Sequence, residues 1–190
     1  MFCWPGYNFI IDELNNFSGN YLEIGVFNGD SIKGIAERYP NKTITGIDPF
    51  IEDGYTSHTT NVSRGEYASE QHKNTIQNID GLSNVLLNVM TSKKFFEELT
   101  DDVVKEMNVS IVLIDGSHWV EDVLLDCELA MKLIGDKPGV VVFDDVGLPD
   151  VDTAYYKFLD DHKDIIGKKF SLTNEGIWAV YVNEENLERT

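Results

Sequence analysis

Acidic residues that directly follow two apolar segments have the composition of a cation site. Asp115 opens a short loop that ends in His118, and Asp144 and Asp145 come directly after the segment 140–143. Carboxylate oxygens are the ligands that Mg²⁺ prefers, and a cation would offset the repulsion among these acids. It would also lower the pKa of a substrate hydroxyl, and His118 is suited to removing that proton as a general base.

Simpler roles for the same residues stay open. A single aspartate at the end of a strand is often a helix cap or a cofactor ligand. We expect Asp115 to contact the cofactor as well as the metal ion. A single histidine in a loop, such as His118, is often a surface residue. Asp144 and Asp145 could begin a turn ahead of Gly147.

A glycine turn over 21–31 predicts a binding site for an adenosine-containing cofactor. Gly25 permits a sharp backbone turn, Gly29 permits close approach of a ligand or of the next helix, and Ser31 is the expected helix N-cap. The spacing is G-x-x-x-G, which differs from the G-x-G-x-x-G of dinucleotide binders. Asp30 would repel a phosphate at the helix N-terminus, so a phosphate-free cofactor is favoured.

Asp48 follows the next apolar strand, about 20 residues further on, where an acid can accept hydrogen bonds from ribose hydroxyls. S-adenosylmethionine has a ribose, a sulfonium cation and no phosphate, and it suits an acidic site. A structural turn with a capping aspartate is the alternative. Two other functions also remain: an NAD-dependent oxidoreductase, and a non-catalytic module that binds S-adenosylmethionine.

These residues need a parallel sheet to bring them together. Continuous apolar segments alternate with helical patterns, which predicts an α/β, Rossmann-like, doubly wound sheet with helices on both faces. In such folds, ligands bind outside the carboxyl ends of the strands, where every motif above lies. The expected strands cover 21–24, 43–47, 85–89, 109–114, 140–143, 169–172 and 177–182. One helix carrying Phe95, Phe96 and Leu99 is expected after the third strand.

The bulk properties predict one soluble domain over 1–190, with 42% hydrophobic and 25% charged residues. Its N-terminal segment 1–19 is expected to be helical, and 51–81 is either a lid over the site or an elaborated crossover. The net charge of −18 disfavours nucleic acid as a partner. No apolar run suggests a membrane span or a secretory signal, and Cys3 and Cys127 fit no disulfide framework, so a cytoplasmic location is expected.

The segments 23–31, 46–49, 114–118 and 142–145 resemble the class I S-adenosylmethionine-dependent methyltransferases. The nearest subgroup contains the macrocin-type sugar O-methyltransferases and is related to the catechol-type O-methyltransferases. The resemblance implies a seven-stranded sheet whose last strand is antiparallel. It also implies Mg²⁺ at Asp115, Asp144 and Asp145, with His118 as the base. The implied cofactor contacts come from the first two strand ends and the turn: Glu23, Gly25, Val26, Phe27, Gly29, Ser31 and Asp48.

The adenine contacts depart from the subgroup pattern. Many relatives carry Gly-Asp or a similar pair after the third strand, whereas this chain has Met90 and Thr91 there. Met90 is expected to pack on the ring, and the Thr91 hydroxyl to reach it. Trp119 resembles an aromatic residue beside the adenine in the catechol group, with simple packing as the alternative.

The leading hypothesis is therefore a Mg²⁺-assisted O-methyltransferase that acts on a small hydroxylated molecule, such as a sugar, a polyol or a catechol-like acceptor. The sequence leaves the acceptor and the oligomeric state open.

Overall fold

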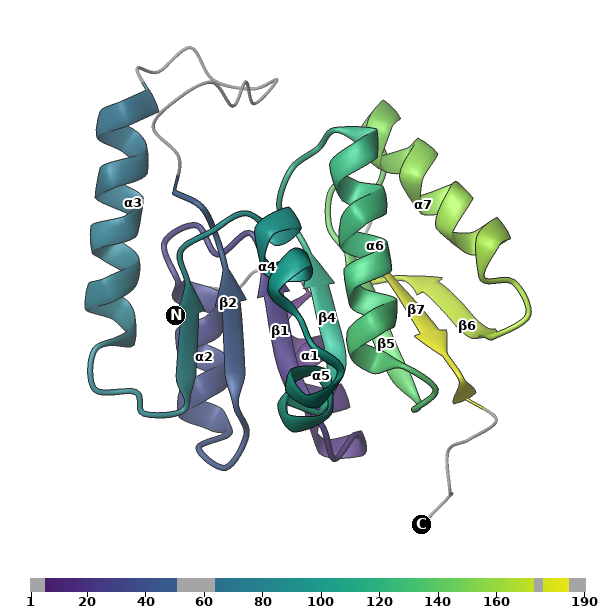
Figure 1. Ribbon diagram of the computed structural model, residues 1–190, viewed down its shortest axis with the longest axis horizontal. Helices are drawn as coiled ribbons and strands as arrows, with labels where there is room; N and C mark the ends of the chain where they lie inside the picture. Colours follow the sequence, from purple (N-terminus) through teal and green to yellow (C-terminus); the bar gives the residue numbers. More distant parts are fainter. Residues whose placement is uncertain (1–5, 51–63, 173–175, 185–190) are drawn as a thin grey trace.

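A mixed sheet of seven strands forms the centre of the computed structural model, which describes residues 6–50, 64–172 and 176–184 (Figure 1). The elements in chain order are α1 Tyr7–Asn16, β1 Asn20–Ile24, α2 Asp30–Arg38, β2 Ile44–Ile47, α3 Arg64–Ile79, β3 Val85–Asn88, α4 Ser92–Glu98, α5 Asp101–Met107, β4 Val109–Ile114, α6 Val120–Ile134, β5 Gly139–Phe143, α7 Pro149–Asp161, β6 Ile166–Ser171 and β7 Trp178–Val182.

The strand order is β3-β2-β1-β4-β5-β7-β6. The first five strands in that order pair in parallel, and β7 lies antiparallel to both β5 and β6. This confirms the predicted seven-stranded Rossmann-like sheet with an antiparallel last strand. The chain runs outward from β1 to β3 and then returns to β4, so the order reverses between β1 and β4. Ligands of doubly wound sheets bind at that reversal.

Helices cover both faces of the sheet, as the continuous apolar strands predict (Figure 1). Alternate residues of β4 point to opposite faces: Val112 packs in the core under α6 and α7, and Ile111 packs in the core under α1 and α2. All six residues of β4 are buried. The strands beside the reversal are thus held between two apolar layers.

The parallel hydrogen-bond ladder continues one residue beyond each central strand. Gly25 N–H donates to Ile47 O at 2.9 Å, and Asp115 N–H donates to Ile24 O at 2.9 Å. Asp48 N–H likewise donates to the last residue of β3, and Asp144 N–H to the last residue of β4. The row Gly25, Asp48, Asp115 and Asp144 therefore lies at one level along the carboxyl edge of the sheet. We call it the edge row.

Two local features differ from the sequence-based expectation. The single helix predicted after β3 is instead two short helices, α4 and α5. The break arises because Thr100 begins a new helix, accepting Val103 N–H through its side-chain oxygen at 3.3 Å. Residues 51–63 of the segment assigned as lid or crossover lie outside the described residues, as does Cys3. Across the described residues, no helix combines the length and apolarity needed to cross a bilayer.

Candidate functional site

The glycine turn joins β1 to α2 through three residues with positive φ: Gly25 at 89°, Phe27 at 53° and Gly29 at 79°. A Cβ at Gly25 would lie 1.9 Å from Asp115 O, so only glycine fits where the ends of β1 and β4 meet. A Cβ at Gly29 would lie 3.0 Å from Thr75 Cγ2, so the second glycine makes room for α3. The turn thus depends on contacts from both sides.

Asp48, which directly follows β2, accepts hydrogen bonds from the turn. Its Oδ2 accepts Val26 N–H at 2.9 Å and Phe27 N–H at 3.1 Å, and its Oδ1 accepts Phe50 N–H at 2.8 Å. Burial raises the pKa of this carboxyl, and the three backbone hydrogen bonds oppose that rise. A carboxylate has about four acceptor positions, so capacity remains for a ribose hydroxyl. The structure thus places Asp48 beside the turn, and its ribose contact stays a prediction.

Glu23 lies beneath the turn and is buried. Its Oε2 accepts the Tyr21 hydroxyl at 2.8 Å, and its Oε1 accepts the Ser31 hydroxyl at 2.5 Å. The prediction that Ser31 caps α2 is wrong, because the helix begins at Asp30, its cap position is Gly29, and no side chain caps it. Burial raises the Glu23 pKa to about 7, against the opposing effect of the two hydroxyls. Glu23 thus supports the turn from within the protein, and its predicted cofactor contact stays a prediction.

The second half of the site lies at the ends of β4 and β5. Ligand atoms of Asp115, His118 and Asp145 lie within 4.8 Å of one another, a spacing that a single metal ion can span. His118 Nε2 is 3.1 Å from Asp145 Oδ2, and the hydrogen bond from His118 lowers the Asp145 pKa. Asp145 has φ 56°, an uncommon conformation for a residue other than glycine.

Asp144 does not belong to that group of ligand atoms, which combines the carboxylates of Asp115 and Asp145 with His118. The side chain of Asp144 turns back, and its Oδ1 accepts Asp145 N–H at 2.8 Å. It still affects the site, because burial first and then repulsion from Asp144 and Glu23 raise the Asp115 pKa well above its usual range. Metal binding by Asp144 stays a prediction.

The loop that carries His118 is braced against α6. Asp122 Oδ2 accepts the Ser117 hydroxyl at 2.7 Å, and Ser117 Oγ accepts Trp119 N–H at 3.3 Å. Trp119 directly precedes α6, and 37% of its surface is exposed. The predicted adenine neighbours of β3 lie at the start of α4, where Thr91 Oγ1 accepts Lys94 N–H at 3.2 Å and Met90 is half-buried.

Sequence reasoning missed three residues that shape this edge. Thr75 and Asn78 of α3 donate hydrogen bonds to carbonyl oxygens of the turn. Asp126 of α6 is 1% exposed, and its Oδ1 has no hydrogen-bond partner within the described residues. Burial raises the Asp126 pKa to about 7, although a hydrogen bond with Ser92 opposes the rise. Polar residues in amphipathic helices usually face solvent, so the sequence carries no signal for these roles.

Comparison with known proteins relates this geometry to established groups. The family described as "Methyltransferase domain" matches residues 22–146, which include the whole edge row. An uncharacterised protein of Acanthamoeba polyphaga mimivirus is 30% identical over 127 residues. The match covers 66% of this chain and 50% of that protein, so the chain spans about half the length of this relative.

Solved structures share the fold at low sequence identity. A Staphylococcus aureus protein assigned as a caffeoyl-CoA O-methyltransferase is 16% identical with TM-score 0.63, covering 96% of this chain and 84% of that one. The O-methyltransferase TomG of Streptomyces achromogenes, solved with S-adenosylmethionine, is 14% identical with TM-score 0.61, covering 93% and 78%. A TDP-rhamnose 3'-O-methyltransferase of calicheamicin biosynthesis is 12% identical with TM-score 0.57, covering 93% and 76%.

We predict that Glu23→Gln raises the free energy of unfolding at pH 8 by about 1–3 kcal/mol. The native state binds the Glu23 proton more tightly than the unfolded chain does, because its pKa is about 7 rather than 4.5. Stability from this group is therefore present below pH 4.5 and is lost as pH rises through 7. Glutamine can hydrogen-bond both hydroxyls without a charge, so the variant should show a flatter profile between these limits.

Urea unfolding at a series of pH values measures this difference. Glu37→Gln, at an exposed position of α2, is the matched control and should leave the profile unchanged. A Glu23→Gln profile parallel to that of the wild type would contradict the role given to burial.

Proposed function

Because this chain belongs to the methyltransferase domain family and has the class I fold, we propose that it transfers a methyl group from S-adenosylmethionine to a hydroxyl of a small molecule, assisted by Mg²⁺. The edge row is the observation that carries the proposal. It places the turn and Asp48, which suit the donor, beside Asp115, which suits an acceptor and a cation. The family assignment replaces the oxidoreductase alternative.

The donor half of the proposal rests on shape and charge. Gly25 lets the main chain pass against Asp115, and Gly29 lets it pass against α3, so the turn brings main-chain N–H groups to the strand ends. Asp48 offers an acceptor to ribose hydroxyls, and its hydrogen bonds within the described residues come from main-chain N–H groups. The sulfonium of the donor carries a positive charge, which suits a chain of net charge −18.

The acceptor half rests on the group Asp115, His118 and Asp145. The Asp115 pKa is raised by burial and by repulsion from its acidic neighbours, so a cation bound there would relieve an existing electrostatic cost. Mg²⁺ favours oxygen ligands, so Asp115 and Asp145 would hold it, with Asp144 as the proposed third carboxylate. When bound, Mg²⁺ would lower the pKa of the acceptor hydroxyl.

His118 is the proposed base, and its contact with Asp145 supports Nδ1 as the nitrogen that accepts the proton. Nε2 faces Asp145 Oδ2 at 3.1 Å, so in the neutral ring Nε2 carries the hydrogen and Nδ1 is the acceptor. As the proton moves to Nδ1, the acceptor oxygen forms a bond to the methyl carbon. The bond between carbon and sulfur breaks, and S-adenosylhomocysteine leaves as a neutral sulfide. Asp145 stabilises the resulting imidazolium.

The similar solved structures support a proposal for the chemical class of the methyl acceptor. The similar structures are described as acting on a caffeoyl-CoA or on a sugar nucleotide, both of which carry hydroxyl groups. The polar edge near His118 and Asp145 suits a polyhydroxylated or catechol-like molecule, whose adjacent hydroxyls can share one cation. We propose this chemical class for the acceptor.

We predict that S-adenosylhomocysteine raises the free energy of unfolding by about 2.7 kcal/mol at 100 times its dissociation constant. Asp48→Asn should remove most of this gain, because it takes an acceptor from both the turn and the ribose. Differential scanning calorimetry measures the shift, and Asp12→Asn on the exposed face of α1 is the control. The cofactor assignment fails if the wild type shows no shift.

We predict that Mg²⁺ binding requires Asp115 and Asp145. Chelation with EDTA should abolish turnover, and Asp145→Asn should weaken Mg²⁺ binding at least about tenfold, since one charged ligand is lost. Isothermal calorimetry in the presence of S-adenosylhomocysteine measures the affinity, with Asp160→Asn, exposed on α7, as the control. Undiminished turnover of chelated protein would refute the metal role and leave the donor site intact.

A further inference from the structure

We propose that α3 holds the glycine turn in its donor-binding shape, and that Thr75 and Asn78 are the positioning residues. The inference rests on the proposed function, because it assigns the turn to S-adenosylmethionine. It adds a second support for the turn, opposite to Asp48 and contributed by a different element. Neither residue needs to touch the donor to act in this way.

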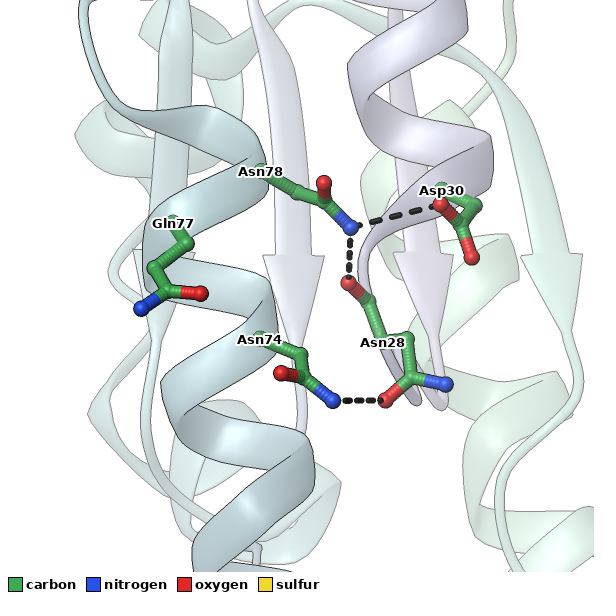
Figure 2. Close-up of a pocket in the computed structure, with 5 residues that line it drawn as sticks. All are labelled: Asn28, Asp30, Asn74, Gln77 and Asn78. Carbon is green, nitrogen blue, oxygen red and sulfur yellow. Dashed lines mark hydrogen bonds between the residues drawn. The ribbon is translucent and has the colours of Figure 1, made fainter.

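The contacts between α3 and the turn involve main-chain carbonyl oxygens. Thr75 Oγ1 lies 2.7 Å from Phe27 O and 2.9 Å from Gln71 O of its own helix, and its single hydrogen is donated to one of these oxygens at a time. Asn78 Nδ2 donates to Asn28 O at 2.8 Å. Longer contacts join the side chains, with Asn74 Nδ2 at 3.3 Å from Asn28 Oδ1 and Asn78 Nδ2 at 3.3 Å from Asp30 Oδ1. Figure 2 shows the two asparagines of α3 pointing at the turn across a polar pocket.

Peptide geometry relates these contacts to the ligand side of the turn. In a trans peptide, the carbonyl oxygen and the next N–H point in opposite directions. Because Phe27 O points to α3, the N–H of Asn28 points away from α3. The amides of Val26 and Phe27 are held by Asp48 in addition. The orientation of the turn's peptide groups is thereby fixed from two sides.

The local backbone explains why such support is needed. Phe27 has φ 53°, which residues other than glycine adopt at a cost, and the residue is 51% exposed. Thr75 is fully buried, and its methyl group faces Gly29, where a Cβ would lie 3.0 Å away. A buried hydroxyl next to a strained peptide offers a directed hydrogen bond that an apolar side chain of the same shape lacks.

The test compares two substitutions at one buried position. Thr75→Val keeps the shape and removes the hydroxyl, whereas Thr75→Ser keeps the hydroxyl and removes the methyl group. We expect Thr75→Val to bind S-adenosylhomocysteine about five- to tenfold more weakly, and Thr75→Ser to stay within about twofold of the wild type. Calorimetric titration gives the dissociation constants. Lys73→Gln, at an exposed position of the same helix outside the polar pocket, is the control.

A second position keeps the test decisive if Thr75→Val does not fold. Asn78→Ala, at a half-buried position, removes the bond to Asn28 O and should weaken S-adenosylhomocysteine binding about threefold or more. Unchanged affinity in the folded variants would overturn the inference, and so would an equal loss in Thr75→Val and Thr75→Ser, which would indicate packing alone. A wild type that binds no S-adenosylhomocysteine would instead refute the proposed function.

Discussion

The position at which the hydrogen-bond ladder of the parallel strands ends determines where the residues of this site lie. Four strand ends, belonging to β2, β1, β4 and β5, finish in register, and the next residue of each donates its N–H across the sheet. Those next residues are Asp48, Gly25, Asp115 and Asp144. Main-chain hydrogen bonds therefore set the spacing between the turn and the acidic group. Side chains then determine what each position can bind.

This arrangement gathers negative charge in a partly buried place. Burial raises the pKa values of Glu23, Asp48 and Asp115, and for Asp115 the neighbouring acids add to the effect. In each case the native state disfavours the ionised form, so the free protein carries an electrostatic cost in this region. A cationic donor and a divalent metal ion are the kinds of ligand that reduce such a cost. Stability and ligand choice are thus linked through the same carboxyl groups.

Most of the fold is legible in the sequence because buried parallel strands are continuous apolar segments, as in β4 and β5. The placement of Asp48 and Asp115 at strand ends follows from the same pattern. The sequence does not predict which of several available partners a polar side chain bonds to. Ser31 bonds to Glu23 rather than capping α2, and Asp145 combines a left-handed backbone with a contact to His118.

The contacts of α3 illustrate the same limit. Thr75 and Asn78 lie in a largely polar helix, where nothing in the residue pattern shows which face meets another part of the chain. Only the position of α3 in the folded protein brings them against the turn. The G-x-x-x-G spacing is informative about the turn itself, but it does not reveal that the second glycine is needed for the approach of a helix.

The hydrogen bonds between α3 and the turn also imply an order of events during folding. Each bond joins two residues that are far apart in the chain, by 48 positions for one bond and by 50 for the other. Strand β2 lies between the joined residues in the sequence. Closing a contact of that span costs loop-closure entropy, which the sheet and helix contacts formed around it must repay. We therefore expect refolding chains to acquire most of their sheet and helix before they can recognise the donor. Ligand capture as early as the circular dichroism signal would contradict this sequence.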